Sequence, residues 1–133
     1  MARPNSEHPT ELELQILKVL WDEEPMTVRA VRDALAAGGR DLAHTTVITM
    51  LSTMVDKGQI EKLEPIQGKA FRFSPLHQRE DVSRGMLGDI VDRVFDGSAE
   101  AVMLSLFDVA DLDEVELANL RKLLNKKMKE GKS

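Results

Sequence analysis

The 133-residue chain contains no cysteine and no tyrosine, and only 4% of its residues are aromatic. Without cysteine it can form no disulfide, no thiolate nucleophile and no cysteine-ligated metal site. No apolar run approaches the roughly 20 residues that cross a membrane as a helix, so we expect no membrane insertion and a cytoplasmic protein. An excess of positive charge is also missing, because the formal net charge is −5.

Signatures of catalysis are missing as well. The chain has three histidines and shows no HExxH pair, no glycine-rich phosphate loop and no serine elbow. Its acidic residues mostly follow helix starts and solvent-facing positions, where the helix dipole accounts for them. We therefore expect neither an enzyme nor a cofactor-binding protein, although a metal site built from Asp and Glu stays open as an alternative.

The charge that is present is unevenly distributed. Residues 1–25 carry two basic and six acidic side chains, and residues 77–133 carry nine basic and twelve acidic ones. Residues 26–76 carry seven basic and five acidic side chains, which is the only positive balance along the chain. An excess of two charges is a weak indication of a nucleic-acid partner, but it directs attention to this segment.

Two capped helices are predicted in the first 40 residues. Thr10 and Glu13 have the spacing of a capping box, and apolar residues then recur at helical spacing as far as Trp21. Thr27 is the expected cap of a second helix, which ends at Gly38-Gly39.

A third helix is predicted for LAHTTVITMLSTMVDKG, residues 42–58, although it contains four threonines, which are poor helix formers. At about 100° per residue, one face is apolar and consists of Val47, Met50, Leu51, Met54 and Val55. The opposite face and its flanks consist of Thr45, Thr46, Ile48, Thr49, Ser52, Thr53 and Asp56. A hydroxyl can donate or accept a hydrogen bond at phosphates and base edges, and the threonine methyl can pack on the methyl group of thymine.

A short hairpin is predicted after this helix, with its turn at Gln67-Gly68. Phe71 and Phe73 alternate with Arg72, so we expect a strand whose buried face is anchored by both phenylalanines. Lys69 and Arg72 are candidates for contacts with DNA phosphates, which position a protein without reading sequence. The alternative for both charges is a plain role in solubility.

Three further helices are predicted from residue 77 onward, and they carry long apolar stripes. A domain of about 76 residues cannot cover all of these stripes, and each side chain would gain about 1.5–3 kcal/mol when buried. We therefore predict a homodimer, the alternative being that the helices fold back on the N-terminal part of the same chain. The expected interface residues are Val82, Met86, Ile90, Val94, Leu117, Leu120 and Leu124.

The expected fold class is mainly α with a small β-hairpin. A winged helix-turn-helix over residues 1–76 is followed by a three-helix dimerisation region over residues 77–133. In a winged helix the third helix enters the major groove and the hairpin forms the wing. We therefore predict a homodimeric transcriptional repressor that reads a palindromic, double-stranded DNA operator with its third helix. The alternative is a winged-helix module for protein–protein interaction without DNA binding, which the net charge of −5 keeps open.

The sequence also resembles a known family. TELELQILKVLWDEEPMTVRAVRDAL, LAHTTVITMLSTMVDKGQIEKL and GKAFRFSPL are similar to the BlaI/MecI/CopY family of penicillinase-type repressors, over about residues 10–128. The resemblance implies a homodimeric winged-helix repressor of palindromic operators. It places the DNA-contacting helix positions on Thr45, Thr46, Ile48, Thr49 and Thr53. Some relatives carry lysine or arginine at the first, third and fifth of these positions, so the operator preference need not be shared.

The resemblance further implies how repression is relieved. Well-studied members are cleaved within the fifth helix, at a pair similar to Asn-Phe, after a signal from a membrane sensor protease that acts as antirepressor. The matching stretch AVMLSLFDVADL places Ser105 and Leu106 in this candidate cleavage region, so the cleaved pair itself is not present. Copper-responsive members carry cysteine pairs near the C-terminus, and copper sensing of that kind is not expected here.

Overall fold

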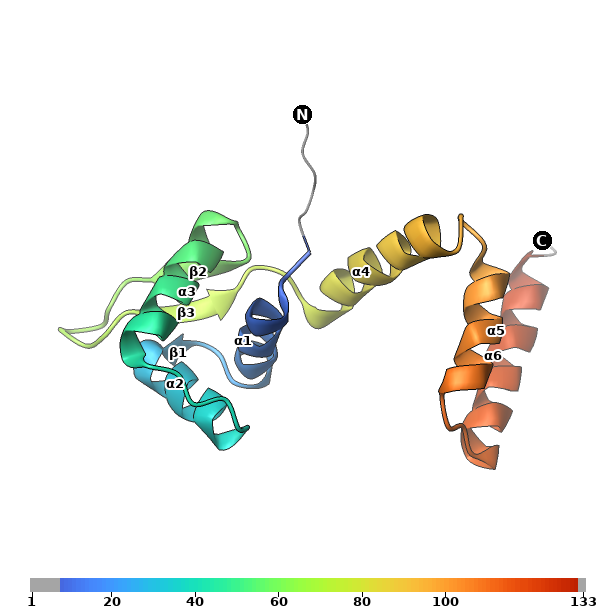
Figure 1. Cartoon of the computed structure of the whole chain (residues 1–133), viewed down its shortest axis with the longest axis horizontal. Helices are drawn as coiled ribbons and strands as arrows, with labels where there is room; N and C mark the ends of the chain where they lie inside the picture. Colours follow the sequence, from blue (N-terminus) through green and yellow to red (C-terminus); the bar gives the residue numbers. More distant parts are fainter. Residues whose placement is uncertain (1–7, 132–133) are drawn as a thin grey trace. The chain divides into compact units, whose positions relative to one another are not determined.

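The computed structural model of the chain describes residues 8–131. Two compact units are formed, residues 1–87 and residues 88–133 (Figure 1). The elements of the first unit are α1 (Glu11–Asp22), β1 (Met26–Thr27), α2 (Val28–Ala37), α3 (His44–Asp56), β2 (Ile60–Leu63), β3 (Arg72–Pro75) and the start of α4 (Arg79–Val94). The second unit contains the end of α4, then α5 (Ala99–Val109) and α6 (Glu114–Gly131).

Side-chain caps determine where several of these helices begin. The Thr10 hydroxyl accepts a hydrogen bond from the Glu13 amide at 3.2 Å, and Glu13 Oε1 accepts one from the Thr10 amide at 3.0 Å. Asp113 and Glu116 form the same reciprocal pair at the start of α6, at 2.8 and 3.2 Å. Thr27 accepts from an amide in the first turn of α2 at 3.1 Å. Each cap satisfies amides that have no partner within the helix, and the caps predicted at Thr10 and Thr27 are confirmed.

The sheet has three strands rather than the two of the predicted hairpin. All pairs are antiparallel and the strand order is β1-β3-β2. Phe73 in the central strand β3 lies opposite Met26 of β1 on one side and Lys62 of β2 on the other. The sequence did not indicate β1 because a strand of two residues shows no periodicity. Thr27 is moreover both the last residue of β1 and the cap of α2.

The prediction that both phenylalanines anchor the wing is correct for only one of them. Phe73 is buried, and the alternation continues to Pro75, which is also buried. Phe71 precedes β3 and is 40% exposed, with Lys62 Nζ at 4.0 Å from the centroid of its ring. The buried face of the strand therefore extends toward Pro75, and Phe71 instead supports a cation–π contact at the base of the wing.

One hydrophobic core holds the first unit together. It is contributed by α1, α2, α3 and the sheet, and its buried members are Ile16, Leu17, Leu20, Met26, Val31, Leu35, Val47, Leu51, Met54, Ile60 and Phe73. Trp21 packs against this core while its Nε1 donates a hydrogen bond to the His77 carbonyl at 2.9 Å. The apolar face predicted for the third helix is thus the face that α3 turns to the core.

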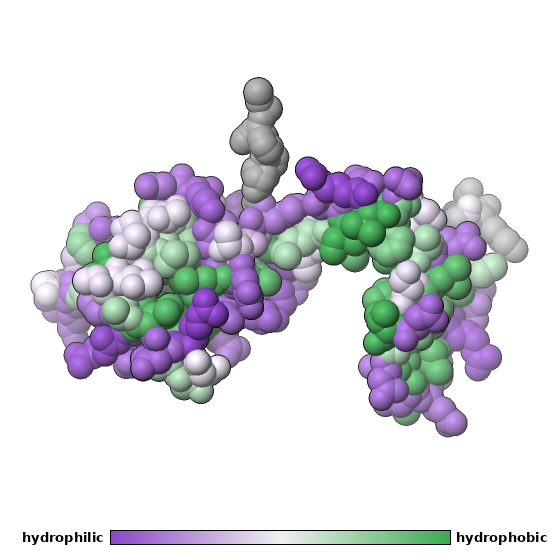
Figure 2. Space-filling model, viewed as in Figure 1, coloured by the Kyte–Doolittle hydropathy of each residue, from purple (hydrophilic) through white to green (hydrophobic). Residues whose placement is uncertain are grey.

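The second unit is different, because none of its described residues, 88–131, is buried. Figure 2 shows hydrophobic residues on the visible surface of these helices. The boundary between the two compact units lies within α4, between residues 87 and 88. The domain boundary expected from the sequence, between residues 76 and 77, stays a prediction. Along residues 8–131, the structure has no helix that combines the length and apolar character needed to cross a membrane.

Candidate nucleic-acid interface

The exposed side of α3 contains most of the predicted site. Thr45, Thr46 and Thr49 are exposed, and Thr53 is half-buried. Ile48 is 43% exposed. The opposite side of the helix is fixed by the buried side chains of Val47, Leu51 and Met54. The core therefore holds a row of hydroxyls and one isoleucine toward solvent.

The composition of α3 limits the chemistry available at this surface. The helix reads HTTVITMLSTMVD and contains no lysine, arginine, asparagine or glutamine. His44 in its first turn and Asp56 at its last residue are its only ionisable side chains. The surface between them can form hydroxyl hydrogen bonds and van der Waals contacts, but no ion pairs.

The rest of the predicted site lies on the wing, the hairpin of β2, β3 and the loop between them, which carries three basic and two acidic side chains. Lys69 lies exposed in the loop, and Arg72 is the half-buried first residue of β3. Gln67 and Gly68 both adopt left-handed conformations, with φ of 51° and 78°, and these reverse the chain at the predicted turn. Figure 1 shows the loop extending away from the helices of the first unit. The predicted residues thus fall into two groups, an uncharged face of α3 and the two basic residues Lys69 and Arg72 on the wing.

A buried carboxylate positions the C-terminal end of α3, and sequence reasoning missed this role. Glu13 is only 2% exposed, and its Oε2 accepts a hydrogen bond from Lys57 Nζ at 2.8 Å. Its Oε1 accepts from Gln59 Nε2 at 3.2 Å as well as from the Thr10 amide. Glu13 therefore joins the start of α1 to the residues that follow α3 and precede β2.

The electrostatics of Glu13 follow from these contacts. Burial by itself raises the pKa of the carboxyl group. The hydrogen bonds from Lys57, the Thr10 amide and Gln59, with the positive charge of Lys57, outweigh burial and hold the pKa below its ordinary value. Glu13 is consequently ionised at neutral pH. This network could not be predicted from the sequence, because the capping box already accounted for Glu13 locally.

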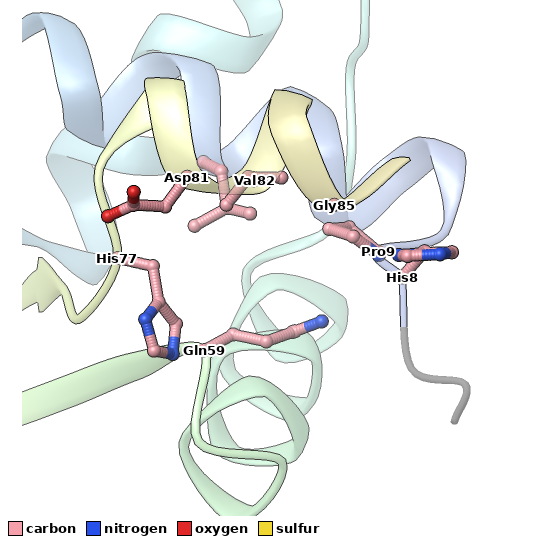
Figure 3. A pocket seen from close by; sticks show the side chains of 8 residues that line it. His8, Pro9, Gln59, His77, Asp81, Val82 and Gly85 are labelled. Atoms are coloured by element: carbon pink, nitrogen blue, oxygen red, sulfur yellow. The ribbon is translucent and has the colours of Figure 1, made fainter. Parts of the chain in front are cut away.

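A hollow of about 250 Å³ lies elsewhere in the first unit (Figure 3). It is lined by His8, Pro9, Leu17, Gln59, His77, Asp81, Val82 and Gly85. No sequence motif links these positions, so only the fold could reveal that they lie together. Across the part of the chain that the structure describes, no three His, Asp or Glu side chains form a group suited to a metal ion.

A three-helix core, an antiparallel sheet with a wing and an exposed third helix define the winged helix-turn-helix class. The family model described as Penicillinase repressor matches residues 9–126 of the chain. The chain therefore belongs to the penicillinase repressor family and is a transcriptional repressor of the BlaI/MecI type. Both the fold class and the family resemblance predicted from the sequence are confirmed.

Two curated relatives, BlaI and MecI, agree with this assignment. The transcriptional regulator BlaI of Mycobacterium tuberculosis is 33% identical over 108 residues, covering 80% of this chain and 76% of that protein. The methicillin resistance regulatory protein MecI of Staphylococcus aureus is 21% identical over 115 residues, covering 86% of this chain and 91% of that protein. Both are named as regulators rather than enzymes. The solved structure of RosR from H. salinarum is 19% identical with a TM-score of 0.49, covering 93% of this chain and 97% of that chain.

Proposed function

We propose that this repressor acts as a homodimer that binds a palindromic, double-stranded DNA operator and reads it with α3. The observation that carries the proposal is the exposed, uncharged and hydroxyl-rich face of α3, held by a core on its other side. The major groove is wide enough for one α-helix, and short side chains allow close approach to the base edges. Thr45, Thr46, Ile48, Thr49 and Thr53 are the proposed reading positions.

The wing supplies the contacts that do not depend on sequence. Lys69 is exposed and Arg72 is partly exposed, so both can approach phosphates flanking the groove. These charges also offset the negative net charge of the chain at the surface that meets DNA. Binding chromosomal DNA would place the protein in the cytoplasm.

The exposed apolar side chains of α4, α5 and α6 support a homodimer. Ile90, Val94, Leu117, Leu120 and Leu124 are 42–66% exposed in the single chain, and Val82 and Met86 are half-buried. Residues 88–131 expose further large apolar side chains on α5 and α6, among them Met103, Phe107, Val109 and Val115. So many exposed large apolar side chains are typical of an interface, and a two-fold dimer presents two copies of α3 to a two-fold site.

Relief of repression is the part of the proposal that depends on the family alone. A membrane sensor protease acting as antirepressor would cleave near Ser105 and Leu106. Both residues lie inside α5, where Ser105 is half-buried and Leu106 is 47% exposed. Cleavage at this position would require local opening of the helix, a step that a helix without buried residues permits more readily than a core helix.

The test is recovery of fragmented DNA from the source organism on purified, folded protein at near-physiological salt, followed by sequencing. The proposal predicts a few strongly enriched fragments that share an inverted repeat. Thr46→Ala and Thr49→Ala should each weaken binding to those fragments by about 1–3 kcal/mol, because each of the two copies of α3 loses a hydroxyl contact worth about 0.5–1.5 kcal/mol. Ser83→Ala is the control. It removes an exposed hydroxyl from α4 and should leave binding to those fragments unchanged.

A protein-interaction module is the second candidate, and the net charge of −5 is the observation that favours it. Uniform or absent enrichment, from protein shown to be folded and dimeric, would overturn DNA reading and favour this alternative. The hydroxyl face of α3 would then be an ordinary solvated surface.

A further inference from the structure

The side chains that usually read purines are absent from α3. Arginine and lysine recognise guanine, and asparagine and glutamine recognise adenine, through paired hydrogen bonds in the major groove. None of these four residue types occurs between His44 and Asp56. The outward face instead offers single hydroxyls and one large apolar side chain, that of Ile48. Hydrogen bonding alone therefore gives this helix little power to distinguish bases.

Ile48 is placed where an apolar contact with DNA can form. It is 43% exposed, and its helix neighbours three positions before and four positions after, Thr45 and Ser52, are exposed as well. The buried Val47 next to it fixes the orientation of this turn against the core. The threonine side chains on either side add methyl groups to the same surface. An otherwise polar reading face thus contains a small apolar patch centred on Ile48.

The major groove offers one apolar group that matches such a patch, the C5-methyl group of thymine. We infer that Ile48 is a specificity-determining residue that reads thymine through this methyl group, and that the operator half-site presents thymine to it. The inference rests on the proposed function and specifies how that function selects its DNA. Base selection would then depend on methyl burial more than on paired hydrogen bonds.

The experiment compares two versions of one operator duplex. Fragments enriched by the wild-type protein are amplified with dTTP or with dUTP, because uracil differs from thymine only by the missing methyl group. One buried methyl group is worth roughly fourfold in affinity, so two symmetry-related contacts predict a loss on the order of tenfold for the uracil duplex. Binding of both duplexes is measured for wild-type protein, Ile48→Ala and Ile66→Ala at one salt concentration.

Ile66 provides the matched control because it is the other exposed isoleucine among the described residues of the first unit, 54% exposed in the wing loop. Ile66→Ala should retain the full difference between the two duplexes, whereas Ile48→Ala should lose most of it while remaining folded. A wild-type protein that binds both duplexes equally would overturn methyl reading and leave operator binding intact. An equal difference in wild type and Ile48→Ala would overturn the assignment to Ile48, with DNA deformability as the explanation. No preference for any fragment would overturn both the inference and the proposed function.

Discussion

At the scale of single residues, the orientation of α3 depends on a carboxylate outside that helix. Glu13 on α1 is bonded to Lys57 and Gln59, which follow α3, at 2.8 and 3.2 Å. Because the carboxylate is buried and multiply bonded, its loss would leave these donors without their charged partner. Lys57 is the C-cap residue of α3, so the network fixes the C-terminal end of this helix. In the proposed function, α3 is the helix that enters the major groove.

Glu13→Gln keeps the shape of this side chain and removes its charge. We expect the free energy of unfolding to fall by about 1–2 kcal/mol, toward the low end for bonds to charged groups because Lys57 remains half exposed. Urea unfolding at neutral pH measures the change. Glu11→Gln is the matched control, since Glu11 lies two residues away and is exposed. Equal losses in both variants would contradict a specific role for the network.

The same carboxylate should make stability depend on pH in a defined direction. The pKa of Glu13 is lowered in the folded state, so its contribution is complete above the ordinary value of 4.5. The contribution is lost as the pH falls below 4.5 and through the lowered folded pKa. Glu13→Gln should therefore lose less stability than the wild type over this acidic range. A parallel decline in both proteins would show that the network does not contribute.

At the scale of elements, we propose that α3 and the wing have different roles in binding DNA. Hydroxyls and Ile48 on α3 would contact base edges, while Lys69 and Arg72 on the wing would contact phosphates. A phosphate contact contributes to binding of any sequence and makes that binding weaken with salt. The two elements should therefore be separable by the salt dependence of binding.

Lys69→Ala should weaken binding to operator and unrelated DNA alike. The slope of log affinity against log salt should become shallower by about 0.9 per lost contact in each chain. Lys62→Ala is the control from the same hairpin, because the Lys62 ammonium group already lies 4.0 Å from the Phe71 ring. A loss confined to one DNA sequence would contradict the phosphate role of Lys69.

Some of these elements could be predicted from the sequence and others could not. Helices whose signals are local could be predicted, because Thr10 with Glu13 and Asp113 with Glu116 lie within one turn of each other. Strand β1 could not be predicted, because two residues are too few to show the alternation of a strand. The burial of Phe71 was predicted wrongly, because alternation along a strand does not show where the hydrophobic core ends. The bonds of Glu13 to Lys57 and Gln59 span 44 and 46 residues, a distance at which only the fold brings partners together.

At the scale of the whole molecule, the second unit leaves apolar side chains exposed. None of its described residues is buried, and several large apolar side chains of α5 and α6 face solvent in the single chain. We propose that a second copy of the chain covers these side chains. A dimer would also double the reading surface, which a single uncharged helix needs in order to bind DNA selectively.

Leu124→Glu tests the dimer directly. Leu124 is 60% exposed in the single chain, so a charge there is unfavourable only if a second chain covers it. Sedimentation should show two chains for the wild type and one for Leu124→Glu, with operator affinity reduced in the variant. Asn125→Glu introduces the same carboxylate at the neighbouring exposed position and should remain dimeric. A wild-type chain that sediments as a monomer would contradict the assembly.

The most direct test of the whole account is a footprint of the protein on an enriched operator fragment, with the number of bound chains measured on the same duplex. A two-fold dimer should give two chains per duplex and two protected major-groove segments, centred about 10–10.5 base pairs apart or a multiple of that spacing. Protection should weaken at both segments together in Thr46→Ala and Thr49→Ala. A single protected segment, or one chain per duplex, would contradict reading by two copies of α3.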